Sequence, residues 1–269
     1  SKQLAVFAGY QPNPDNVPIL NLWVTDGTAS GTSRLRVEGA RPPPAPGTNA
    51  FGGLLSYVPA PDFTAFGGDV LFVGVDARGK TGLWVTNGTA SGTSELSVAG
   101  ASPRGLFHNN GKPDFTVFGP KVLFDGADSG GKDGLWVTDG TAAGTSELRV
   151  RGASASGLKP GGITVFGKKV LFAGTDSNGS RGLWVTHGTS KRTHELNVSS
   201  ASPPGLRPND LTVFGNKVLF SGTDSNGSPG LWVTRGTAKS THELNVTGAL
   251  AFGFGPNSFK VFGDKVLFV

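Results

Sequence analysis

Four short segments rich in Asp, Asn and Gly carry the side chains best suited to bind a polar ligand. They read VDARGKTG, ADSGGKDG, TDSNGSRG and TDSNGSPG, and a Leu-Trp-Val-Thr segment follows each of them. Carboxylate and amide groups form paired hydrogen bonds with neighbouring hydroxyls, and glycine lets a ligand approach backbone amides. The candidate ligand-binding residues are therefore Asp76, Asp128, Asp176, Asn178, Asp224 and Asn226.

Two other interpretations of these turns have to be weighed. An EF-hand calcium loop needs a carboxylate at its twelfth position. Counted from each Asp, that position holds Asn87, Asp139, His187 and Arg235, so the calcium interpretation fails. No metal ion or other cofactor is expected. The second interpretation is structural: the segment resembles an Asp-box, a hairpin turn in which the Asp side chain binds its own loop.

The residues that catalysis would require are scarce or repeated. Cysteine is absent, only four histidines occur, and there is no Gly-x-Ser-x-Gly segment. Five-bladed glycosidases place one unique pair or trio of carboxylates in a central pocket. Here the acids recur once per repeat, as in Glu95, Glu147, Glu195 and Glu243. Because a catalytic site breaks symmetry, we expect a binding protein and no enzyme.

Five copies of one segment organise the chain. GLWVTDGTAAGTSELRV begins at Gly134, and variants of it begin at Asn21, Gly82, Gly182 and Gly230. The tryptophans of successive copies are 61, 52, 48 and 48 residues apart. A period of about 40 to 50 residues without an amphipathic helical pattern is typical of a β-propeller, in which each repeat forms one blade.

Each repeat contains four short strand patterns. In one repeat they cover Leu211–Gly215, Lys217–Gly222, Leu231–Thr234 and His242–Val246, with turn signals between them. The first two are apolar on both faces, which is typical of a sheet covered on both sides. The first, third and fourth patterns occur five times. We therefore expect an all-β fold, a single five-bladed β-propeller over residues 1–269 with four-stranded blades.

The order of the patterns predicts how the ring closes. The closing blade is expected to combine residues 1–38 with residues 259–269, so that N- and C-terminal segments pair. The second pattern has six copies, because both Leu4–Gly9 and Lys265–Val269 resemble it. We expect the C-terminal copy to hold the inner position beside Phe259–Phe262. The N-terminal copy is then expected to lie outside the regular blade pattern.

Several other recurrent residues have a structural and a binding interpretation. A tryptophan in the middle of a strand fills space between blades or stacks on a sugar ring. The Gly-Thr pairs of DGTASGT are expected to be scaffold, because the residue before the Gly varies freely. A Leu or Phe in each long link plugs a gap between blades or forms one wall of a shallow pocket; these residues are Leu54, Leu106, Leu158, Leu206 and Phe254.

Charge and hydropathy limit the classes of partner that the chain is expected to bind. The chain has 24 Lys and Arg against 19 Asp and Glu, and its pI is about 9.6. The basic residues are scattered, which favours solubility over specific nucleic-acid binding. No apolar run is long enough to cross a membrane, so no membrane insertion is expected. The first residues lack the apolar core of a signal peptide.

The repeated segment also supports a resemblance. LWVTDGTAAGTSEL resembles the ELW-x-x-DGT-x-x-GT tandem repeats of bacterial proteins, which are often secreted or surface-bound. The resemblance covers nearly the whole chain and implies a β-propeller-like array in an extracellular or cell-envelope setting. It implies no single activity. One departure is that the Glu of ELW is replaced by Gly82, Gly134, Gly182, Gly230 or Asn21.

The function expected from these features is that of a multivalent carbohydrate-binding protein, a lectin, with about one shallow site per blade. The first site is expected to be altered, because its loop reads YQPNPDNVPILN. Its partners would be glycans, anionic and cell-surface ones included, and a homo-oligomer is compatible with the pattern. The alternative is a structural or adhesive propeller that binds a protein through the Pro-rich insertion at residues 41–61.

Overall fold

The computed structural model describes residues 4–12, 18–41, 54–55, 61–107, 113–201, 204–248 and 255–269. In these ranges the chain forms short antiparallel β-sheets and two single-turn 3₁₀ helices, η1 (Ser190–Arg192) and η2 (Ala238–Ser240). Neither the length nor the hydropathy of these described helices would let one cross a membrane. The expected all-β fold is therefore confirmed.

Four sheets repeat one antiparallel pattern, whose strands we call a, b, c and d in chain order. The first two of these sheets contain β4 (Thr64–Phe66), β5 (Asp69–Val75), β6 (Thr81–Thr86) and β7 (Thr93–Glu95), then β8 (Thr116–Phe118), β9 (Lys121–Ala127), β10 (Asp133–Thr138) and β11 (Ser146–Glu147). The other two contain β12 (Gly161–Phe166), β13 (Lys169–Thr175), β14 (Arg181–Thr186) and β15 (Thr193–Glu195), then β16 (Asn209–Phe214), β17 (Lys217–Thr223), β18 (Pro229–Thr234) and β19 (His242–Glu243).

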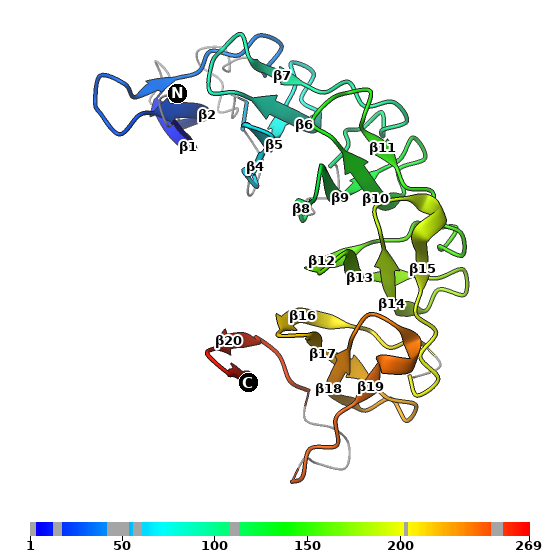
Figure 1. Cartoon of the computed structure of the whole chain (residues 1–269). Coiled ribbons are helices and arrows are strands. Elements are labelled where there is room, and N and C mark those ends of the chain that lie inside the picture. The colour runs from blue at the N-terminus through cyan, green and yellow to red at the C-terminus, as the bar shows by residue number, and fades with distance from the viewer. Residues whose placement is uncertain are drawn as a thin grey trace.

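Incomplete sheets lie at both ends of this series. The N-terminal sheet has three strands, β1 (Ala5–Pro12), β2 (Pro18–Thr25) and β3 (Ser33–Arg34), and the C-terminal one is the hairpin β20 (Lys260–Phe262) and β21 (Lys265–Leu267). Successive sheets follow an arc, as blades of a β-propeller do, and the two ends of the arc stand apart (Figure 1). Because the end segments form separate sheets, the predicted closing blade is unconfirmed.

The N-terminal strand corrects one expectation. β1 pairs with β2 along its whole length, and Phe7 lies opposite Trp23. The same register places Phe72 opposite Trp84 in the next sheet. The N-terminal copy of the second pattern is thus a regular b strand, and the prediction that it lies outside the blade was wrong. The C-terminal copy does pair with β20, as expected.

In each four-stranded sheet, a Phe–Trp pair packs against aliphatic residues of the sheet before it. The rings of Phe124 and Trp136 stack with centroids 6.3 Å apart, and both side chains are at most 1% exposed. They pack against Leu71 and Leu83 of the preceding sheet. Alternation along a strand puts Trp and Thr on one face and Leu and Val on the other, so each c strand contributes to two interfaces. Of the two interpretations, burial supports the space-filling one for Trp84, Trp136, Trp184 and Trp232, which are at most 1% exposed.

A glycine in each b strand makes room for the indole. A Cβ on Gly126 would lie 3.0 Å from Cδ1 of Trp136, closer than real Cβ atoms normally come to a ring. The equivalent glycines face their tryptophans in the same way; they are Gly9, Gly74, Gly174 and Gly222. The sequence Phe-x-Gly in strand b and Leu-Trp in strand c therefore form one packing unit.

The link leucines fill the gaps between neighbouring sheets. Leu54, Leu106, Leu158 and Leu206 are nearly inaccessible to solvent, and each belongs to a core cluster that spans two sheets. This confirms that they plug the interfaces. Phe254, the corresponding residue of the last link, and most of the insertion at residues 41–61 lie outside the described residues.

A threonine relay explains the recurrent Gly-Thr pairs in the c–d turn. The hydroxyl of Thr193 donates to the carbonyl of Thr189 at 2.7 Å, so the hydroxyl of Thr186, 2.6 Å away, donates to Thr193. Thr186 in turn accepts the backbone N–H of Gly188 at 3.0 Å. Both relay hydroxyls are buried, and the same chain of bonds recurs in the other four sheets with a c strand. These residues are scaffold, as expected.

The variable residue of the same turn changes together with a residue five positions later. Asn87 Oδ1 accepts the backbone N–H of Thr89, and its side chain fills the space that a Cβ on Gly92 would need. Asp26 and Asp139 likewise precede Gly31 and Gly144. Where the first residue is His187 or Arg235, the later one is Arg192 or Ser240, and the turn contains a 3₁₀ helix.

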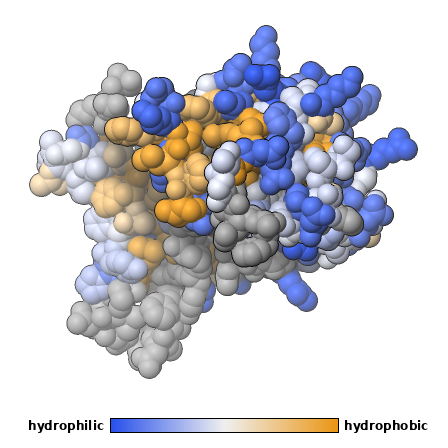
Figure 2. Space-filling model, turned by 90° about the horizontal axis from the view of Figure 1, so that it is seen from below, coloured by the Kyte–Doolittle hydropathy of each residue, from blue (hydrophilic) through white to orange (hydrophobic). Residues whose placement is uncertain are grey.

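The two ends of the arc expose surfaces that are buried elsewhere. Phe7 on β1 is 37% exposed, although its equivalent Phe72 is completely buried. On β21, Leu267 is 58% exposed, whereas its equivalent Leu219 is 7% exposed. Apolar residues gather on part of the surface when the molecule is seen from below (Figure 2). Each end therefore presents one half of the interface that joins neighbouring sheets.

Replacing Thr186 by Val tests the threonine relay. Valine keeps the volume but leaves the Gly188 N–H and the Thr193 hydroxyl without their buried partner, so we expect a loss of about 1–3 kcal/mol in the free energy of unfolding. Thr189→Val is the matched control, because the Thr189 side chain is exposed. Equal urea midpoints for the two variants would show that the relay does not stabilise the turn.

Candidate ligand-binding pockets

The predicted Asp residues hold their own turns together. Asp176 Oδ1 accepts the backbone N–H groups of Asn178 at 2.9 Å and Ser180 at 2.7 Å. Asn178 Nδ2 donates to the second oxygen of the same carboxylate at 3.3 Å. Asp76, Asp128 and Asp224 bind their turns in the same way. The structural interpretation of these turns therefore holds, and a binding role for the six predicted residues stays a prediction.

These turns also contact the preceding link of the chain. The backbones of Ala153 and Asp176 form an antiparallel bridge, and the backbone N–H of Ser177 donates to the carbonyl of Gly152 at 2.8 Å. Equivalent bridges join Ala40 to Asp76, Ala101 to Asp128, and Ala201 to Asp224. Each b–c turn is thus fixed against the neighbouring blade, which gives any site beside it a rigid wall.

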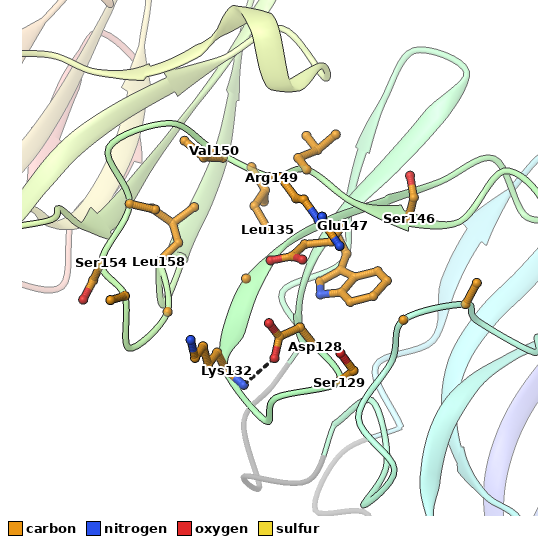
Figure 3. Close-up of a pocket in the computed structure, with 18 residues that line it drawn as sticks. Asp128, Ser129, Lys132, Leu135, Ser146, Glu147, Arg149, Val150, Ser154 and Leu158 are labelled. Carbon is orange, nitrogen blue, oxygen red and sulfur yellow. Dashed lines mark hydrogen bonds between the residues drawn. The ribbon is translucent and has the colours of Figure 1, made fainter.

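A cavity of about 440 Å³ lies beside one of these turns, in the sheet β8–β11 (Figure 3). Asp128 and Lys132 of the turn line one side, and Glu147 and Arg149 line another. Leu158, the plug residue of the next link, supplies an apolar surface. The cavity thus combines hydrogen-bonding groups with a hydrophobic wall, which is the usual composition of a small-ligand site.

The next sheet contains a cavity of about 330 Å³ in the equivalent place. Asp176 and Asn178 of the turn line it together with Glu195, Asn197 and Leu206. Two predicted binding residues therefore reach a pocket here. No Lys or Arg belongs to the described lining of this cavity, so its polar groups are carboxylates, amides and hydroxyls.

The glutamates of strand d are site residues that sequence reasoning missed. Glu147 lies opposite Trp136 in strand pairing, and its Oε1 occupies the space that a Cβ on Gly134 would need. The same exclusion links Gly82 with Glu95, Gly182 with Glu195, and Gly230 with Glu243. The sequence did hold the signal, because Gly precedes the Leu-Trp pair wherever strand d carries Glu.

Burial and like charge perturb these glutamates. Desolvation is the main cause that raises the pKa of Glu195 to about 7, and the negative charge of Asp176 raises it further. Desolvation followed by the nearest turn Asp also raises the pKa of Glu95, Glu147 and Glu243. The two described pockets of these sheets therefore place a partly buried carboxyl, that of Glu147 or Glu195, beside a second carboxylate.

The first sheet carries an altered version of the pocket. Its cavity of about 250 Å³ is lined by Asn21 and Arg34, which stand where the other sheets have Gly and Glu. Arg36 and Arg41 also line it. The pocket is smaller and positively charged. Its b–c loop includes residues 13–17, which lie outside the described residues.

One buried acid breaks the symmetry of the repeats. Asp125 stands in strand b where the other sheets have Ala8, Val73, Ala173 and Ser221, and its Oδ1 is buried without a hydrogen-bond partner. Desolvation raises its pKa to about 8, the charges of Asp133 and Asp114 add to the shift, and the Gly126 N–H and Arg181 oppose it.

Metal binding gains no support from the described ranges. Within them, His, Asp and Glu side chains do not gather in groups of three or more that would ligate an ion.

Asp125→Ala tests the shifted carboxyl. A folded-state pKa of about 8 lies above the unfolded value, so the native state binds the extra proton and stability falls as the pH rises from about 4 to 8. We expect the variant to gain a few kcal/mol above about pH 8 and to match the parent near pH 4. Asp264→Ala, whose side chain is exposed, is the control. Parallel stability–pH curves for parent and variant would contradict the shift.

No family model and no curated protein matches this sequence. Among solved structures, the chain is similar to a TolB-like protein from Agrobacterium tumefaciens, with 12% identity, coverage of 90% of this chain and 80% of the other, and a TM-score of 0.40. TolB from Acinetobacter baumannii is 15% identical over 77% of this chain and 47% of its own, with a TM-score of 0.39. The β-propeller domain of the Trilobed protease from Pyrococcus furiosus is 12% identical, with coverage of 98% of this chain and 85% of the other, and a TM-score of 0.31.

Proposed function

We propose that the chain is a multivalent carbohydrate-binding protein, a lectin, that uses the pockets beside its b–c turns. The observation that carries this proposal is the recurrence of one constellation, in which a turn Asp, a strand-d Glu and a link Leu surround a cavity. Carboxylates accept hydrogen bonds from neighbouring sugar hydroxyls. The link Leu, which is nearly inaccessible to solvent, closes one side of the cavity.

Binding fits these pockets better than catalysis does. A raised carboxyl pKa beside a second carboxylate is also the pattern of a glycosidase acid and base pair. Here, however, Asp176 already accepts three hydrogen bonds from its own turn and is held in place by them. A nucleophile or base needs an available oxygen lone pair directed at the substrate. Repetition of the pair in four sheets likewise favours several equal binding sites.

The arrangement of the blades suits weak, repeated binding. Sites fixed on a rigid scaffold raise the overall affinity for a multivalent surface without any new contact. We propose five blades, with residues 1–38 and 259–269 together completing the last one. The apolar side chains that Phe7 and Leu267 expose favour contact between the two ends of the chain. An extracellular or cell-envelope location is part of the same proposal, since surface glycans are found there.

A glycan array with charge-neutral variants tests the function. We expect the parent to bind a set of glycans, and Glu→Gln at residues 95, 147, 195 and 243 together to reduce avidity by roughly 10²-fold or more. A single Glu195→Gln should cost far less. Glu38→Gln is the control, because Glu38 is exposed and outside the described pocket linings. An array without hits, or a quadruple variant that binds like the parent, would contradict the proposal.

The alternative is a structural or adhesive propeller that binds a protein and no sugar. The Pro-rich insertion at residues 41–61 favours it, since the insertion occurs in one link only. Deleting residues 42–53 should then abolish partner binding and leave the melting temperature nearly unchanged. If binding instead depends on pockets in several sheets, this alternative fails.

A further inference from the structure

The pocket of the first sheet is lined by basic residues, whereas its equivalent in the sheet β12–β15 is lined by the acids Asp176 and Glu195. Arg34 lies opposite Trp23 in strand pairing, as Glu95 lies opposite Trp84 in the next sheet. Arg41 corresponds to Ser102, because the residues just before them, Ala40 and Ala101, form equivalent bridges. Two positions that are acidic or neutral elsewhere have thus become arginine in the same cavity.

Three arginines line this cavity from different parts of the blade. Arg34 belongs to β3, Arg36 follows it after one residue, and Arg41 lies in the link to the next sheet. Asn21 takes the place of the glycine that accommodates Glu in the other sheets. The described lining of the cavity contains no Asp or Glu. The described lining residues that carry charge are thus all basic.

The guanidinium groups that line this cavity indicate which ligands it binds. Desolvation and then the charge of Arg36 lower the pKa of Arg34, so the two guanidinium groups disfavour each other's charge. An anion between them offsets this repulsion. Guanidinium groups bind sulfate, phosphate and carboxylate through two parallel hydrogen bonds, which an ammonium group does not match. The volume of about 250 Å³ suits a small group.

We propose that the first sheet holds an oxyanion-binding site formed by Arg34, Arg36 and Arg41. Its ligand is a sulfate, phosphate or carboxylate group, either free or carried by an anionic glycan. The site goes beyond the proposed function, because it concerns the one described pocket that lacks the Asp and Glu pair. The oxyanion proposal does not depend on sugar binding in the other sheets.

Sulfate is the probe for a direct test by NMR, titrated at constant ionic strength against chloride. We expect saturable shifts in the backbone amides of residues 34, 36 and 41 and in the Arg34 side-chain N–H. Arg34→Gln with Arg41→Ser should weaken sulfate binding by roughly tenfold or more. Arg149→Gln, which removes an arginine from the pocket containing Glu147, is the matched control and should leave sulfate binding unchanged.

A gain-of-site variant keeps the test independent of damage to the first sheet. Gly134→Asn with Glu147→Arg recreates the Asn and Arg pair beside the existing Arg149. We expect a second set of saturable sulfate shifts in that sheet. Non-saturable shifts spread over all basic residues, or equal sulfate affinity in the parent and the Arg34 variant, would overturn the proposal.

A sulfated disaccharide and its desulfated counterpart identify the source of the anion. Tighter binding of the sulfated disaccharide than of inorganic sulfate supports the site as an anionic-glycan subsite. Equal affinity for the two supports a site for the free ion. Equal affinity for the sulfated and desulfated sugars, read from the shifts of residues 34, 36 and 41, overturns the oxyanion proposal. A glycan array without hits, together with saturable sulfate binding, would contradict only the proposed lectin function.

Discussion

The packing of an indole over a glycine governs the architecture of this protein. Each tryptophan of strand c packs on the phenylalanine of the neighbouring strand b and covers a glycine of that strand b. Trp136 does so with Phe124 and Gly126. Any Cβ at that glycine would displace the ring from its place against the preceding sheet. Burial of this large aromatic pair is the main contact between successive sheets, since aromatic side chains dominate core energetics. The recurrence of Phe-x-Gly and Leu-Trp follows from this one constraint.

A second glycine connects this scaffold to the candidate sites. Gly134 precedes the Leu-Trp pair. Because it has no side chain, Glu147 of strand d occupies the space beside it. The indole of Trp136 and the carboxyl group of Glu147 thus lie on the same face of this strand pair, because directly paired residues point to the same side. Because the strand that fixes the core also forms a pocket wall, every copy of the scaffold carries a copy of the pocket. In the first sheet the exchange of Gly and Glu for Asn21 and Arg34 alters the pocket while the aromatic stack remains.

The sequence predicted the elements more completely than the sites. Strand order and type follow from period and local pattern, so the b–c hairpin near Trp232 appears where it was expected. The outer strand β19 is shorter than its predicted range, because pairing stops at Glu243. The steric relation between the Gly before Leu-Trp and the Glu of strand d was missed, because it acts between two strands and depends on their register. Asp125 was likewise missed, although it stands in a strand pattern that was expected to be covered on both faces.

The exposed surfaces at the two ends have a consequence for how copies of the fold can meet. One end presents the stacked aromatic half around Phe7, and the other presents the aliphatic half around Leu267. These halves fit each other and not themselves. Contact through them is therefore heterologous and has a direction, so it can close a ring or extend a filament, but it does not join two identical ends. A strand pair that is aromatic on one face and aliphatic on the other thereby sets the direction in which copies of the fold can associate.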